Sequence, residues 1–62
     1  MEAEEIKKLR KLLGLNQTQL ADKLGVTKTT VLNWEHKLTR PSKLALRQLN
    51  RLSTALDDLT KV

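Results

Sequence analysis

Apolar residues recur along this chain at intervals of three and four positions, the spacing of one face of an α-helix. The pattern predicts four helices, over about residues 2–13, 17–24, 28–36 and 42–58. No segment of the sequence alternates apolar and polar residues as a half-buried strand does, and β-branched residues are confined to caps, turns and isolated core positions. We therefore predict an all-α fold, a compact four-helix domain that ends in a long C-terminal helix.

The first and last predicted helices each carry a long apolar stripe. The residues of the first stripe are Ile6, Leu9 and Leu13, with Leu12 beside them. The last helix begins near Pro41, which fits a first helical turn, and Ser42, a good cap. Its stripe steps by four and three positions through Ala45, Leu49, Leu52, Leu56 and Leu59, widened by Leu44 and Leu46. We expect both stripes to face the core and the last few residues to fray.

Two similar triplets separate the first three helices, Gly-Leu-Asn at residues 14–16 and Gly-Val-Thr at residues 25–27. Each glycine can take the left-handed conformation that ends a helix, and the Asn or Thr side chain can cap the next one. The apolar residue between them suits a hydrophobic staple with the fourth residue of the following helix. The two predicted staple pairs are Leu15 with Leu20 and Val26 with Val31.

The two short central helices are predicted to cross closely over the turn at Gly25. Ala21 is small where the second helix must pass near the first. The facing apolar residues are Leu20 and Leu24 on one helix and Val31 and Trp34 on the other. Trp34 is therefore interpreted as a core residue rather than as a platform for base stacking. Two helices joined in this way by a short turn are typical of a helix-turn-helix, here residues 17–35.

Four residues of the second central helix are left on its outer face, namely Lys28, Thr29, Leu32 and Asn33. Lys28 can donate to guanine, and Asn33 can pair with adenine, in the major groove of DNA. Leu32 has three interpretations, which are a contact with a thymine methyl group, an inert surface leucine and a contact with a protein. The pattern favours a recognition helix over about residues 28–36.

Positive charge is concentrated in one part of the chain. The net charge is +5, and residues 28–51 contain six Lys or Arg residues against a single acid, Glu35. The bases and acids of the remaining residues cancel. A basic surface beside a recognition helix is typical of a protein that meets a phosphate backbone. The alternative is a solvated basic face with no partner.

Composition argues against several other classes of protein. Sixty-two residues make one small domain, and a chain with no Cys and one His has neither a disulfide nor a zinc site of its own. Ser42 and Ser53 lack the context of a catalytic serine, and adjacent Asp57 and Asp58 point in different directions on a helix. No apolar run reaches the length of a membrane span. We expect a cytoplasmic protein that is not an enzyme, with no cofactor, no small-molecule substrate and no membrane contact.

The chain resembles the Xre or lambda-repressor-like helix-turn-helix proteins, which include the lambdoid phage repressors and Cro proteins. The resemblance extends over about residues 6–56. Its markers are Gly14-Leu15-Asn16-Gln17, Leu20-Ala21, Leu24-Gly25-Val26-Thr27, the spacing from Val31 to Trp34-Glu35, and Arg40-Pro41-Ser42. It implies a transcription regulator that binds double-stranded DNA.

The resemblance also implies roles for single residues. Lys28, Thr29 and Asn33 match positions that read base edges, to which we add Leu32. The residues expected to contact phosphates are Arg10, Asn16, Gln17, Thr27, Lys37, Arg40 and Lys43. Arg10 and Glu35 match a pair that bridges the first and third helices of the phage repressors.

Two departures from the family and one rival function stay open. The family often has a glycine just after the Glu35 position, where residues 36–38 here are His-Lys-Leu, and its phage repressors use a fifth helix in pairing. A homodimer on DNA is therefore possible but not assured. The rival is a protein-interaction module on the same fold, antitoxin-like or coactivator-bridging, which exposed Leu32 and Leu59 would suit. The orderly caps would also suit an engineered DNA-binding domain.

Overall fold

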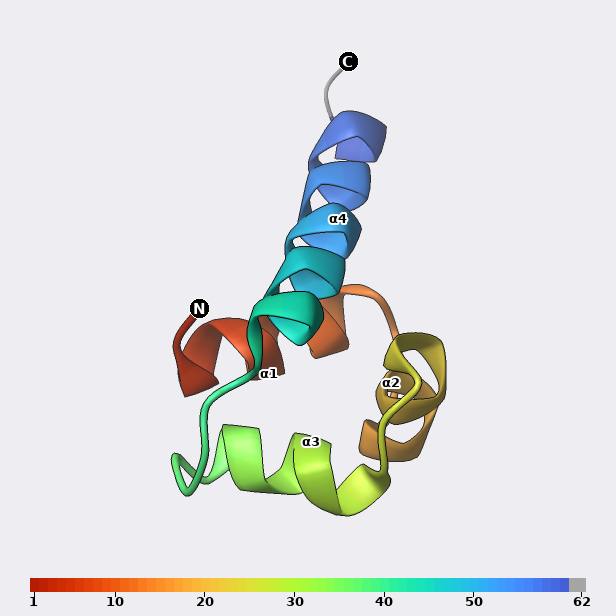
Figure 1. Ribbon diagram of the computed structural model, residues 1–62. Helices are drawn as coiled ribbons and strands as arrows, with labels where there is room; N and C mark the ends of the chain where they lie inside the picture. Colours follow the sequence, from red (N-terminus) through yellow and green to blue (C-terminus); the bar gives the residue numbers. More distant parts are fainter. Residues whose placement is uncertain (61–62) are drawn as a thin grey trace.

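The computed structural model describes the backbone of residues 1–60 and the side chains of residues 1–56. Its helices are α1 (Ala3–Leu12), α2 (Gln17–Leu24), α3 (Lys28–Glu35) and α4 (Lys43–Thr60), as Figure 1 shows. The all-α prediction is confirmed, and α4 continues two residues past the predicted end at Asp58. The final residues that we expected to fray, 61 and 62, lie outside the described part of the chain.

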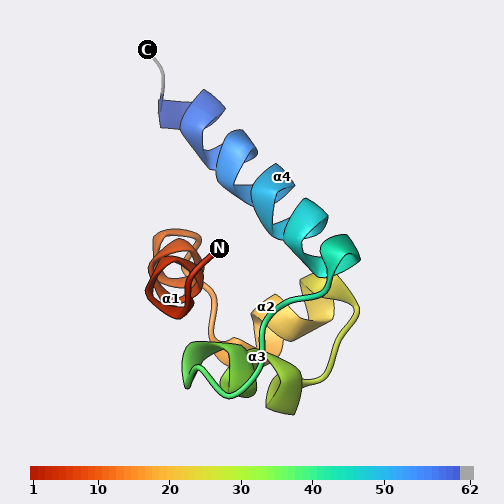
Figure 2. The same cartoon turned by 60° about the vertical axis from the view of Figure 1, so that its left-hand side comes forward.

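The helices are arranged around the pair α2 and α3, which pack on each other across the turn at Gly25. Helix α1 lies against α3, and the first turns of α4 lie beside α2 (Figures 1 and 2). The end of α4 extends beyond the other three helices and gives the molecule its long axis, 36 Å against 21 and 20 Å. The outer face of α3 is left uncovered.

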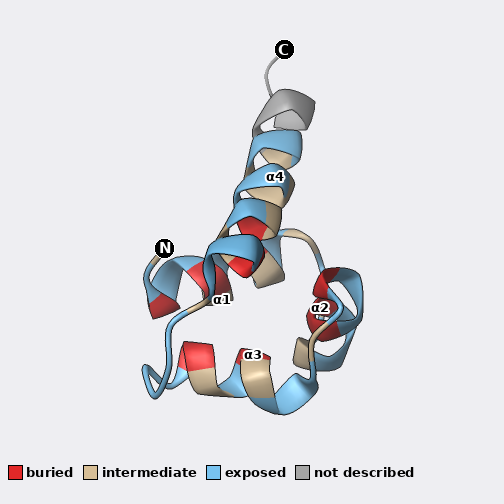
Figure 3. Cartoon of the chain, viewed as in Figure 1, coloured by how far each residue is buried: buried red, intermediate tan, exposed pale blue. Residues whose placement is uncertain are grey.

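The core is built from the apolar stripes predicted for each helix. Buried positions face inward on every helix in Figure 3, and the most deeply buried large side chains are Ile6, Leu20, Val31 and Leu49. Trp34 is buried in the same cluster, as predicted. Leu15 and Val26, the residues predicted to act as staples, are half-buried and pack against this cluster. Each fully buried aliphatic side chain stabilises the fold by roughly 1.5–3 kcal/mol.

Two predictions about the edges of these stripes were wrong. Leu44 is 65% exposed and Leu12 is 60% exposed, although both were expected to widen an apolar stripe. On α4 the buried line passes through Ala45 and Leu49, and Leu44 is rotated by about 100° from Ala45 around the helix. The predicted cap at Ser42 is confirmed, since its Oγ accepts from the Ala45 N–H at 3.2 Å. Pro41 therefore lies just before α4 and not in its first turn. The side chain of Leu59 lies outside the described residues.

Helices α1, α2 and α3 end in the same left-handed turn. The turn residues are Gly14 and Gly25, both with φ of 71°, and Lys37, with φ of 63°. In each case the next residue donates its N–H back into the helix, from Leu15 to Arg10 at 3.1 Å, from Val26 to Ala21 at 3.0 Å, and from Leu38 to Asn33 at 2.9 Å. Lys37 thus takes the conformation that glycine takes at the two other turns, at a cost of roughly 1–2 kcal/mol.

Replacing Gly25 by valine should lower the free energy of unfolding by about 1–3 kcal/mol. A Cβ at Gly25 would meet no atom within 4 Å, so the loss should come from backbone strain at φ of 71° and not from a clash. Urea unfolding measures it. The control is Thr29→Val, which also introduces a valine, but on the exposed face of α3. Equal urea midpoints for the two variants would refute the left-handed turn at Gly25.

Replacing Lys37 by glycine should instead stabilise the domain, by about 1 kcal/mol, because glycine adopts positive φ without strain. The matched control is Lys11→Gly in the last turn of α1, where the same substitution should destabilise by a similar amount. Both variants can be compared by urea or thermal unfolding. A loss of stability at position 37 would contradict the strained backbone.

Candidate nucleic-acid interface

Helix α3 begins at a capped N-terminus and presents a polar outer face. Thr27 caps the helix, since its Oγ1 accepts from the Thr30 N–H at 3.2 Å and lies 2.9 Å from the Thr30 hydroxyl. Lys28, Thr29 and Leu32 are exposed, in agreement with the predicted face. The cap therefore sets the position at which the outer face of α3 starts.

Asn33, the fourth residue predicted on this face, is only half-exposed. The turn after α3 folds back next to it, because the Asn33 carbonyl accepts from the Leu38 N–H at 2.9 Å and from the Thr39 N–H at 3.5 Å. Asn33 thus lies at the edge of the face rather than at its centre. The sequence pattern missed this because it treated α3 without the loop that follows.

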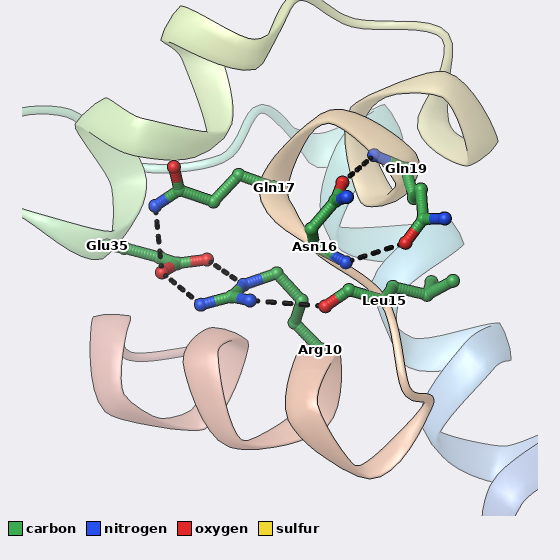
Figure 4. Close-up of polar contacts among 6 residues, drawn as sticks. All are labelled: Arg10, Leu15, Asn16, Gln17, Gln19 and Glu35. Atoms are coloured by element: carbon green, nitrogen blue, oxygen red, sulfur yellow. Dashed lines mark hydrogen bonds and ion pairs between the residues drawn. The ribbon is translucent and has the colours of Figure 1, made fainter.

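The N-terminus of α2 is closed by a reciprocal cap. Asn16 Oδ1 accepts from the Gln19 N–H at 2.8 Å, and Gln19 Oε1 accepts from the Asn16 N–H at 2.9 Å (Figure 4). Asn16 itself is exposed. The first turn of a helix has free N–H groups and a partial positive charge, which together favour an anion such as phosphate.

A buried polar cluster joins α1, α2 and α3 beside the N-terminus of α2. Arg10 donates through Nε to Glu35 Oε2 at 2.7 Å and through Nη2 to Glu35 Oε1 at 3.1 Å (Figure 4). Its Nη1 donates to the Leu15 carbonyl at 3.1 Å, in the segment between α1 and α2. Gln17 Nε2 completes the cluster by donating to Glu35 Oε1 at 3.3 Å. The pair that the resemblance implied is therefore present.

Glu35 is ionised at neutral pH although its side chain is only 2% exposed. Burial by itself raises its pKa, because a carboxylate loses hydration in the protein interior. Hydrogen bonds from Arg10 and Gln17, together with the positive charges of Arg10 and Lys7, outweigh burial and lower the pKa of Glu35 below its ordinary value. The carboxylate can therefore hold both partners in place.

The cluster changes what Arg10 and Gln17 can offer to a ligand. All three guanidinium nitrogens of Arg10 donate within the protein, and its side chain is 14% exposed. Gln17, the first residue of α2, has its amide nitrogen anchored on Glu35. The sequence did not predict this link, since the residues lie 18 positions apart and no local pattern relates them. Phosphate contacts by both residues stay predictions.

Three further residues predicted to contact phosphates come after α3 in the sequence. Lys37 lies in the left-handed turn, Arg40 in the loop and Lys43 at the start of α4, and all three are exposed. The loop joins the end of α3 to α4 in Figure 1. These cations therefore lie at the C-terminal end of α3. Gln17 is held near the same end by its hydrogen bond to Glu35, the last residue of α3.

Two further features of the described residues bear on other functions. No group of three or more His, Cys, Asp or Glu side chains is placed to hold a metal ion in that part of the chain. Among the helices described, α4 included, none combines the length and hydropathy needed to cross a bilayer.

Comparison with protein-family models matches residues 6–56 to a family described as helix-turn-helix. The match includes the whole of residues 17–35 and all the predicted site residues. Comparisons with curated proteins and with solved structures gave no significant match.

Breaking the Arg10–Glu35 pair should show strong coupling between the two side chains. Arg10→Met or Glu35→Gln alone leaves a buried partner unsatisfied, so each should cost about 1–3 kcal/mol. The double variant should lose less than the sum, with a coupling energy of about 1 kcal/mol or more. The exposed pair Glu4 and Lys8 on α1 is the control, where we expect about 0.3 kcal/mol.

The coupling energy between Arg10 and Glu35 should decrease as the pH is lowered. Because the folded pKa of Glu35 is lowered from its ordinary value of 4.5, its contribution to stability is present above that value and is lost as pH falls through the folded pKa. Double-mutant cycles by urea unfolding at neutral pH and at about pH 3 measure this loss. Additive effects at neutral pH would mean that the pair does not hold α1 and α3 together.

Proposed function

Because the chain belongs to the Xre/lambda-repressor-like helix-turn-helix family, we propose that it binds a specific double-stranded DNA sequence by placing α3 in the major groove. The family is one of DNA-binding proteins that are typically transcription regulators. The observation that carries the proposal is the uncovered outer face of α3, bordered by cations on the loop that follows it. We infer that the protein is a regulator of transcription.

In this proposal, the outer face of α3 reads bases. The Lys28 ammonium donates to guanine O6 and N7, and the Asn33 amide pairs with adenine N6 and N7 at the edge of the face. Thr29 lies between them on the exposed first turn. Leu32, which is 36% exposed, contacts a thymine methyl group. The half-exposed position of Asn33 suits a residue with few conformations to lose on binding.

Phosphate contacts position α3 without reading the sequence. Thr27 meets the DNA backbone at the start of α3, and Gln17 and the free N–H groups beside Asn16 meet it at the N-terminus of α2. Lys37, Arg40 and Lys43 meet the backbone at the C-terminal end of α3, the end at which Glu35 also holds Gln17. Arg10 acts mainly by holding Glu35, and through it Gln17, in place. If two copies bind together as a homodimer, helix-turn-helix geometry places their half-sites about one DNA turn apart.

The proposal predicts that Asn33→Ala reduces specificity. It should cost about 1–3 kcal/mol on the preferred duplex and little on scrambled DNA, flattening the preference at one base pair. Asn50→Ala, on the exposed surface of α4, is the matched control and should change neither. Fluorescence titration with both duplexes measures the effect, and an equal loss on both would show that Asn33 does not read a base.

Arg40→Ala should reduce affinity without changing specificity, because a phosphate contact carries no sequence information. It should weaken all duplexes alike and reduce the slope of log K against log salt by about one phosphate contact. Lys8→Ala, an exposed cation on α1, is the control for the change in net charge. Titrations at several salt concentrations measure the slope. A selective loss on the preferred duplex would place Arg40 among the base-reading residues.

A further inference from the structure

A groove separates the C-terminal end of α2 from the first half of α4. Its volume is about 370 Å³, and it is lined by Lys23, Leu24, Leu44, Arg47, Gln48, Arg51 and Leu52. Figure 2 shows these two helix segments next to each other. No residue of α3 or of the loop after it lines the groove. The base-reading and phosphate-binding residues proposed above are therefore separate from it.

The groove combines an apolar surface with a cationic rim. Leu24 is buried, Leu52 is half-buried, and Leu44 is 65% exposed at the side of the groove. A leucine exposed to this extent beside further leucine surface can gain free energy when a partner covers it.

Three exposed cations surround this apolar surface. Lys23 lies on α2, whereas Arg47 and Arg51 lie one turn apart on α4, about 6 Å along the helix axis. The segment from residue 36 to residue 56 contains no Asp or Glu. Among the side chains of residues 1–56, the only ion pair joins Arg10 and Glu35, so no carboxylate of that part of the chain is paired with Lys23, Arg47 or Arg51. The rim is free to meet an acidic partner.

We propose that this groove binds an acidic amphipathic helix of a protein partner. Its apolar side chains, at intervals of three and four residues, cover Leu44 and Leu52, and its carboxylates meet Lys23, Arg47 and Arg51. Nucleic acid fits less well, because phosphates would use the cations but gain nothing from Leu44. A second copy fits less well too, since like-charged rims would face each other in a symmetric contact.

The location of the groove gives the interaction a consequence. A partner in the groove touches α2 and α4, so α3 stays uncovered. The protein could therefore hold its partner while its recognition helix is occupied. Binding of the partner itself does not depend on the DNA-binding function proposed above.

The test uses a synthetic amphipathic peptide of about five helical turns, with leucines on one face and glutamates on the flanks. NMR titration of the isotope-labelled full chain should show saturable shifts at Leu24, Leu44, Gln48 and Leu52. A peptide with glutamine in place of glutamate, and another with glutamine in place of leucine, should each bind at least about tenfold more weakly.

Matched protein variants separate the groove from general charge. Leu44→Gln, and the double variant Arg47→Gln with Arg51→Gln, should each weaken the acidic peptide at least about tenfold. Leu38→Gln, and the double variant Lys37→Gln with Arg40→Gln, remove one leucine and two positive charges outside the groove and should leave peptide affinity unchanged.

Several results would overturn the proposal. These are the absence of saturable binding, shifts centred on α3, equal effects of the two sets of variants, and affinity that survives Leu44→Gln. Groove shifts that depend on protein concentration without peptide would assign the surface to a second copy instead. DNA binding by Leu44→Gln is measured separately, by titration with a duplex. A failure of the proposed DNA binding can therefore be distinguished from a failure of peptide binding in the groove.

Discussion

The ion pair between Arg10 and Glu35 is the interaction on which the rest of the structure depends. An unpaired carboxylate as deeply buried as Glu35 would cost several kcal/mol, so its position requires a cation with fixed geometry. The planar guanidinium meets this need, since it can donate to both carboxylate oxygens and still reach the Leu15 carbonyl. One side chain of α1 thereby fixes the end of α3 and the entry to α2.

This constraint matters because the two helices of the motif are short. Helices α2 and α3 have eight residues each, a length at which an isolated helix is marginal in water. Their positions therefore depend on caps, on the shared core and on the polar cluster. Gln17 links these supports to the proposed phosphate contact, because its hydrogen bond to Glu35 orients the first residue of α2. Lys37 adds a cation at the end of α3 where glycine would relieve backbone strain.

The sequence predicted features that depend on near neighbours. The caps at Asn16 and Thr27 and the turn at Gly25 follow from side-chain chemistry within four residues, and all are present. The same local patterns, repeated at helical spacing, identified Trp34 and Leu49 as core residues. The fold class could therefore be predicted with no knowledge of tertiary contacts.

The features that sequence reasoning missed depend on contacts between distant segments. The Gln17–Glu35 hydrogen bond requires α2 and α3 to be already packed. Leu44 lies outside the core because the buried face of α4 is narrow: apolar spacing predicted its line through Ala45 and Leu49, but how far the face extends to either side depends on the helices packed against it. The groove beside Leu44 has no counterpart in any local pattern, since α2 and α4 both line it.

The most direct test of the central claim is selection of bound duplexes from a random pool by the full chain at two salt concentrations. We predict that one short motif is enriched, and that it stays enriched at the higher salt concentration while total binding falls. A chain that binds only through its positive charge would lose affinity with salt in the same way but would enrich no sequence. Absence of an enriched motif would contradict base reading by α3 and would favour a protein-interaction module on the same fold.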